Sequence, residues 1–173
     1  MDAKYPLQMR AMHWLLALII LCLLAVGLYM ESLSRDDQMR PTLYAMHKSF
    51  GVTVFLLLLL RIFFRVRLGV PALPDVISML ERRLALLGHY AFYVFMIVMP
   101  LSGFLMTNAF GFAVKLFGIE LPRLIGPDRD LGRTLETVHK FSAYLLIALI
   151  VLHVAGVIKH RLKDKVNLLQ RMI

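Results

Sequence analysis

Four long runs of apolar residues divide the chain of 173 residues, and they restrict its fold more than any other feature. The runs cover about residues 11–30, 48–66, 86–106 and 138–158. A helix crosses a hydrocarbon core about 30 Å thick with roughly 20 apolar residues, so each run is long enough to span a membrane. Backbone groups inside lipid have no water to bond, and every run is therefore expected to be helical. The sequence predicts an all-α integral membrane four-helix bundle, in a single transmembrane domain over residues 1–173.

The composition agrees with lipid as the solvent and excludes several classes of protein. Hydrophobic residues make up 60% of the chain, whereas ordinary soluble domains have about 45–50%. The single cysteine, Cys22, excludes a disulfide framework, a cysteine zinc site and the CxxCH attachment of a c-type haem. The net charge of +9 lies in short connections between apolar runs, so no nucleic-acid partner is expected.

The distribution of positive charge predicts the orientation of the helices in the membrane. The N-terminus, the connection between the second and third runs and the C-terminal tail carry 12 of the 20 Lys and Arg residues and four of the 11 acidic residues. The opposite side carries the other eight and seven, which leaves +1 there against +8 on the first side. Cytoplasmic loops carry an excess of Lys and Arg. Both termini are therefore expected to be cytoplasmic.

The connection between the third and fourth runs, residues 107–137, contains a second apolar stretch. It reads FGFAVKLFGIEL from Phe110 to Leu121 and has only two charges. A mostly apolar segment of this length next to a membrane span is typical of a short helix lying in the interface. We therefore expect such a helix on the outer side.

The histidines are the candidate functional residues, because each lies inside or at the edge of an apolar run. Ionisable residues in membrane helices are energetically unfavourable and normally face the bundle interior or a functional site. Two of them are 14 residues apart on the fourth run, which places them on one helix face about 21 Å apart. Two flat macrocycles stacked along a bundle need this arrangement, and a single zinc ion could not take both ligands. The six are His13, His47, His89, His139, His153 and His160.

The depth of each run in the membrane predicts how the histidines pair. His47 begins the second run on the outer side, level with His139, so these two form the predicted outer haem site. On the inner side, both His13 and His89 lie about level with His153, and sequence geometry does not separate them. If His89 does not bind iron, it would contact a haem propionate or make a buried hydrogen bond.

Two further groups of residues border the proposed ligands. His160 lies seven residues beyond His153, near the inner surface. It is a candidate to contact a propionate or a quinone head group, or else a surface histidine beside Lys159 and Arg161. Small residues near the ligands are compatible with flat cofactors between helices, and they are Gly51, Gly88 and Gly156.

These motifs resemble those of the bacterial cytochrome b561 family, which is related to the cytochrome b subunits of nickel-iron hydrogenases. The resembling segments are, in order, YPLQMRAMHWLLAL, MHKSFG, LLGHYAFY, VHKF and LHVAGVIKH. Each segment is short, and the resemblance depends on their order and on the match of length and helix number over essentially the whole chain.

The resemblance implies two haems b in a four-helix bundle of the bacterial inner membrane. The implied axial pairs are His13 with His153 and His47 with His139, which leaves His89 and His160 as neighbours of the haems or of a quinone. Family members pass electrons between ubiquinone and a partner. One implied oxidoreductase activity oxidises superoxide at the periplasmic surface and reduces quinone. The basic residues that could attract superoxide there are Arg35, Arg40, Lys48, Arg123, Arg129, Arg133 and Lys140.

Two other functions fit the same sequence. One is a cytochrome b subunit that anchors a dehydrogenase or hydrogenase to the membrane and passes its electrons to quinone. The other is a histidine-lined transporter for protons or a divalent metal, which broken helices would favour. Two imidazoles on each iron leave no open coordination position, so electron transfer rather than oxygen activation is the expected chemistry of a haem-containing chain.

Overall fold

The computed structural model describes residues 4–74 and 76–173, and four long helices account for most of them. All four are long and apolar enough to cross a membrane, which confirms the predicted all-α membrane bundle. Each helix extends beyond its apolar run at both ends. The bounds are α1 Leu7–Ser32, α2 Arg40–Leu68, α3 Met79–Ala109 and α4 Arg129–Leu162.

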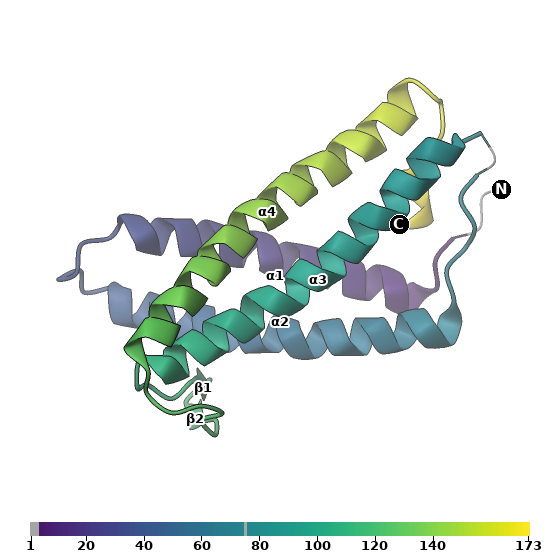
Figure 1. The fold of residues 1–173 in the computed structure, drawn as a ribbon. Coiled ribbons are helices and arrows are strands. Elements are labelled where there is room, and N and C mark those ends of the chain that lie inside the picture. The colour runs from purple at the N-terminus through teal and green to yellow at the C-terminus, as the bar shows by residue number, and fades with distance from the viewer. Residues whose placement is uncertain (1–3, 75) are drawn as a thin grey trace.

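The helices pack as two pairs. Helix α1 lies against α2, α3 lies against α4, and the pairs meet through α2 and α3. Figure 1 shows both chain ends at one end of the bundle, together with the α2–α3 connection. We call this the terminal end, and we call the opposite end, which carries the α1–α2 and α3–α4 connections, the hairpin end. On α4, His139 therefore lies nearer the hairpin end and His153, fourteen residues later, lies nearer the terminal end.

Local sequence signals explain where the helices begin and end. Ser78 caps α3 in a reciprocal capping box with Glu81. The Asp128 side chain accepts two backbone N–H groups at the start of α4. Pro41 lies in the first turn of α2, where its missing N–H is no loss, and Gly69 ends that helix at a φ of 71°. These polar caps lie outside the apolar runs, so the helices are longer than the runs.

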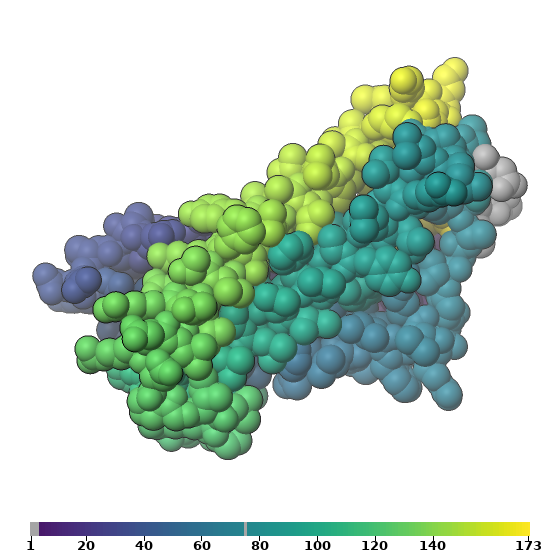
Figure 2. All heavy atoms as spheres, in the orientation of Figure 1, coloured from purple at the N-terminus to yellow at the C-terminus, as the bar shows by residue number. Residues whose placement is uncertain are grey.

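The buried core lies between the two ends and is formed by few residues. Its central cluster comprises Leu16, Ile20 and Leu24 of α1, Val54 of α2 and Leu146 of α4. Many other large apolar side chains, such as Leu18 at 62% exposure and Leu152 at 68%, are not covered by protein. In Figure 2 the side chains of α3 and α4 meet along their length, and their outer surfaces are free. Such surfaces are expected of helices whose solvent is lipid.

The α3–α4 connection forms a hairpin, and the expected interfacial helix over Phe110–Leu121 is wrong. Strands β1 (Lys115–Leu116) and β2 (Ile119–Glu120) pair antiparallel through a two-residue turn. The turn residues Phe117 and Gly118 have φ values of 49° and 95°, and such positive values fit tight hairpins but not a helix. The Ser49 hydroxyl donates to the Lys115 carbonyl and accepts from the Phe117 N–H. The hairpin is thus fixed to α2.

At the terminal end, the two chain ends are joined to each other and to the α2–α3 connection. The short 3-10 helix η1 covers Leu168–Arg171. The buried Arg171 side chain donates to the carbonyls of Pro71 and Ala72, and its backbone carbonyl accepts from Tyr5. The Trp14 indole donates to the Met172 carbonyl at 2.8 Å. These bonds fix the C-terminal segment beside the start of α1.

Candidate cofactor site

Five of the six histidines gather in two clusters at different depths of the bundle. Near the hairpin end, the ring centroids of His47 and His139 are 6.3 Å apart. Toward the terminal end, the centroid of His153 is 6.4 Å from that of His13 and 6.1 Å from that of His89. The outer pair expected from topology is therefore together in space, and so are all three inner candidates.

These separations fit imidazole rings on opposite sides of one metal ion. Metal bonds to imidazole nitrogen are about 2.0 Å long, and the ring centre lies about 1.1 Å behind the nitrogen, so opposed rings have centroids roughly 6.2 Å apart. The two clusters belong to one face of α4, about 21 Å apart along its axis. The buried Leu146 lies halfway between His139 and His153 and packs in the apolar core. Both clusters therefore fit an axial pair on a haem iron.

His139 is oriented by the helix beside it. One ring nitrogen, Nδ1, lies 2.8 Å from the Met99 carbonyl and 3.4 Å from the Ser102 hydroxyl. A carbonyl accepts, so Nδ1 carries the proton and Nε2 keeps a free lone pair. Ligating histidines are held in this way by a bond to their second nitrogen. His139 thus has the tautomer and the orientation of a metal ligand.

His47 has a different environment. Its Nδ1 is buried and has no hydrogen-bond partner among residues 4–74 and 76–173. A buried nitrogen without a partner is unfavourable, and a metal or a cofactor can satisfy it. An apolar cavity between the four helices is lined by both His47 and His139, and the other lining residues include Ile20, Gly51 and Met99. This end of the bundle therefore suits an apolar macrocycle with two imidazole ligands.

Two glycines make room for the rings of this pair. A Cβ on Gly27 of α1 would lie 3.3 Å from Cε1 of His47. A Cβ on Gly103 of α3 would lie 3.0 Å from Cε1 of His139 and 3.1 Å from its Nδ1. The sequence reasoning missed both glycines. The sequence analysis named three other glycines as compatible with flat cofactors, namely Gly51, Gly88 and Gly156. These have open space beside them, because a Cβ there would meet nothing within 4 Å among the described residues.

The inner cluster keeps the alternative that the sequence left open. Both His13 and His89 lie at a suitable distance from His153. Nδ1 of His89 is 2.6 Å from the Ala85 carbonyl in its own helix, and Nδ1 of His13 is 3.5 Å from an Arg61 guanidinium nitrogen. Arg61 also donates to the Met9 carbonyl. Arg61 is thus held beside the His13 ring.

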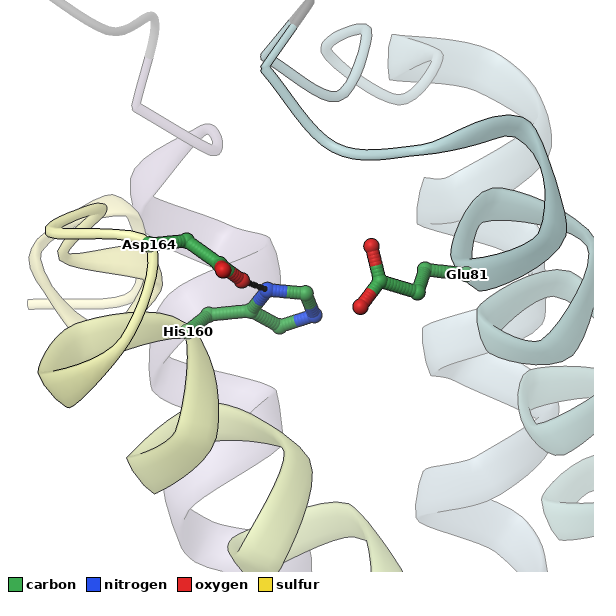
Figure 3. A group of neighbouring side chains, drawn as sticks. All are labelled: Glu81, His160 and Asp164. Atoms are coloured by element: carbon green, nitrogen blue, oxygen red, sulfur yellow. Dashed lines mark hydrogen bonds and ion pairs between the residues drawn. The ribbon is translucent and has the colours of Figure 1, made fainter.

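His160 is separate from both clusters. It belongs to a group of four side chains at the terminal end, Glu81, Lys159, His160 and Asp164, which we call the terminal cluster. Figure 3 shows three of them, Glu81, His160 and Asp164. His160 Nδ1 and Lys159 Nζ each lie 2.6 Å from Asp164, and Lys159 also bonds Glu81 of α3. The hydrogen bonds from Lys159 and His160 hold the pKa of the Asp164 carboxyl below its usual range. The cluster joins the start of α3 to the end of α4.

A basic cavity lies at the hairpin end. Its volume is about 280 Å³, and it lies between the start of α2 and the hairpin. Lys48 and Arg123, which the sequence reasoning named, line it together with Lys115, Glu120 and Phe112. Lys48 directly follows His47. The cavity thus places an excess of positive charge next to the outer histidine pair.

Comparisons with known proteins identify the family of the chain. The family model for prokaryotic cytochrome b561 matches residues 4–173. A relative described as cytochrome b561 homolog 2, from Escherichia coli strain K12, is 29% identical over 171 residues, covering 98% of this chain and 91% of the relative. A probable superoxide oxidase CybB from Yersinia pestis is 27% identical over 173 residues, covering 100% of this chain and 97% of the relative.

Proposed function

Because the chain belongs to the prokaryotic cytochrome b561 family, it is a bacterial membrane cytochrome b with an electron-transfer role, and we propose that it is a di-haem superoxide:ubiquinone oxidoreductase. Superoxide would be oxidised at the hairpin end and ubiquinone reduced at the terminal end. The resemblance over the full chain to a relative described as a probable superoxide oxidase supports superoxide as the electron donor.

One observation carries the proposal, namely two histidine clusters on one face of α4 with ring separations of 6.3 and 6.4 Å. In this proposal His47 and His139 hold the outer haem, and His13 and His153 hold the inner one. When bound, haem b would supply a one-electron carrier. Each histidine pair would hold one carrier at its depth in the bundle, and two imidazole ligands would leave no position for oxygen.

The basic cavity supports superoxide as the donor. The lining contains three cationic side chains, Lys48, Lys115 and Arg123, and one carboxylate, Glu120, so it has an excess of positive charge. Such a surface attracts a small anion and raises its local concentration. Two superoxide anions would each lose one electron there and leave as dioxygen. The two electrons would reduce one ubiquinone, which must also take up two protons.

The terminal end is the proposed quinone end. His89 and His160 lie there, and they are the proposed contacts for the quinone head group. The excess of Lys and Arg at this end supports a cytoplasmic orientation in the inner membrane. Protons for the quinol would then come from the cytoplasm.

The first test is a dithionite-reduced minus oxidised spectrum of the purified protein, with the haem-to-protein ratio. We expect b-type absorption and two haems per chain. A ratio of one would contradict one of the assigned pairs, and an absence of haem would leave the histidine-lined transporter as the better explanation.

The second test is stopped-flow mixing of the oxidised protein with superoxide. We expect rapid haem reduction, then reoxidation by added ubiquinone. Replacing Lys115 and Arg123 by Gln should slow the first step and weaken its dependence on salt, because steering by the cavity is electrostatic. Haems that stay oxidised would exclude superoxide as the donor. A co-purifying iron-sulfur or flavin dehydrogenase would instead favour the membrane-anchor function.

A further inference from the structure

Among the charged groups of residues 4–74 and 76–173, only the terminal cluster has a histidine between two carboxylates. Glu81 comes from the first turn of α3, His160 from the last turn of α4, and Asp164 from the segment just after α4. One donor atom from each of these three residues lies within 4.8 Å of the others. Figure 3 shows the His160 ring between the two carboxylates, with Nδ1 on Asp164 and the other nitrogen directed toward Glu81.

We propose that the terminal cluster binds a divalent transition-metal ion of the zinc type, through His160, Glu81 and Asp164. Zinc takes imidazole nitrogen and carboxylate oxygen at about 2.0–2.2 Å, so its ligand atoms lie roughly 3.4 Å apart in a tetrahedron. The donors therefore need to close by little more than an ångström, through side-chain rotation at two helix ends. A water molecule would fill the fourth position.

The support of His160 agrees with a ligand role. Its Nδ1 is bonded to Asp164 at 2.6 Å, so two of the three proposed ligand residues are already in contact, and side-chain rotation would direct both toward one ion. The His160 side chain is 13% exposed and that of Asp164 is 20% exposed, so the site is partly shielded from water. The ring is thus held in place before any metal arrives.

The charge of the cluster also points to a cation. Two carboxylates face the single ammonium group of Lys159, which bonds both of them. Lys159 therefore occupies the position that a metal ion would take, and it must move aside when the metal binds. Its side chain is 36% exposed and long enough to turn outward to solvent. The lysine and the metal are competitors for the same carboxylates.

A similar cluster at the hairpin end provides a control. Lys140 bonds Glu31 at 3.1 Å and Glu136 at 3.3 Å, which again places two carboxylates around one lysine. This group has no histidine, and its side chains are 43–49% exposed. It has the charge of the terminal cluster without the nitrogen donor, and we expect it to bind zinc poorly.

The experiment uses the full-length, haem-loaded protein in detergent, treated with a chelator and then dialysed against zinc chloride. Zinc and iron are measured together by elemental analysis. We expect one zinc per chain with no loss of iron, because the proposed haem ligands lie elsewhere. Less than one zinc at saturation, or zinc that displaces iron, would overturn the proposal.

Variants separate the cluster from other histidines. His160→Gln and Glu81→Gln should weaken zinc binding about tenfold or more, the range seen when a ligand or its support is lost. Glu136→Gln should leave the affinity unchanged. Lys159→Gln removes the competitor and should bind zinc more tightly than the unaltered protein.

Equal affinity in His160→Gln, or weaker binding in Lys159→Gln, would contradict the site. Haem absorption checks the fold of each variant. Zinc is measured without added quinone, because a metal on His160 would compete with the quinone contact proposed for the same ring.

Discussion

The two histidine clusters differ in how completely the surrounding protein defines them. At the hairpin end there are two histidines, and each ring is met by a glycine on the neighbouring helix, Gly27 or Gly103. His139 is also fixed by the Met99 carbonyl. Toward the terminal end there are three histidines, and two of them lie at a suitable distance from His153. The first cluster therefore specifies one pair, and the second leaves a choice.

This difference suggests distinct roles for the two ends. A ring held by backbone and packed against glycine has little freedom, so the outer cofactor should have one defined ligand geometry. The inner cluster has a spare imidazole, His89, and adjoins Arg61 and the C-terminal segment that binds Trp14. Extra polar groups are what a site for quinone and protons would need. In the proposed function, the hairpin end would be the fixed site of electron entry, and the terminal end would be the site of quinone reduction.

The largest expected effect is loss of a whole cofactor. Replacing His139 by Ala removes one of the two proposed ligands of the outer haem, and replacing His153 by Ala removes one of those of the inner haem. A single remaining imidazole should not retain the cofactor. Each variant should bind one haem instead of two, measured as a haem-to-protein ratio by pyridine haemochrome. Retention of two haems in either variant would show that the fourteen-residue spacing does not define the two sites.

The next experiment addresses the choice in the inner cluster. His13→Ala should reduce the ratio to one haem, whereas His89→Ala should keep two and change only the inner potential or the quinone kinetics. Redox titration followed by absorption measures both. The reverse outcome, with haem lost in His89→Ala and retained in His13→Ala, would assign the ligand to α3 and contradict the family-based pairing.

A smaller effect should follow from filling the glycine contact at the outer pair. In Gly103→Ala the new methyl group lies 3.0 Å from the His139 ring, which must then shift. Overpacking of this kind destabilises a protein by about 1–3 kcal/mol. We expect a lower thermal midpoint and weaker retention of the outer haem. Gly88→Ala on the same helix is the control, because its Cβ meets nothing within 4 Å among the described residues. Equal effects of the two changes would remove any special role for Gly103.

Most of the fold could be predicted from the lengths of the apolar runs, because lipid permits only helices at those lengths. The helix ends could not. Helix α4 begins at Arg129, well before its apolar run, since the Asp128 cap and the Glu136–Lys140 ion pair stabilise polar turns that hydropathy does not register. The hairpin was missed for a related reason, because composition does not distinguish an apolar helix from an apolar turn that needs φ above zero at Phe117.

The candidate site, like the fold, could be predicted only in part from the sequence. Spacing along one helix predicted that His139 and His153 share a face, and topology brought His47 to the first of them. Contacts between helices depend on rotation about each axis, which the sequence does not contain. Gly103 and Met99 lie some 40 residues from the ring they touch, and Glu81 lies 78 residues from Lys159. Such partners needed the structure.

The smallest expected effect concerns the ion pairs of the terminal cluster. The pKa of Asp164 is lowered, first by the hydrogen bond from Lys159 and also by that from His160. A carboxyl with a lowered folded pKa stabilises the protein above its ordinary, unfolded pKa, and this contribution is lost as the pH falls through the lowered value. Asp164→Asn should therefore lower the thermal midpoint slightly at neutral pH. The gap between variant and unaltered protein should close in acid, below the usual aspartate range.

Glu136→Gln, at the exposed cluster of the hairpin end, is the comparison, and thermal scans with a chelator present keep metal binding out of the result. A gap for Asp164→Asn that stays constant from neutral to acid pH would mean that the charge of Asp164 does not stabilise the fold through Lys159 and His160.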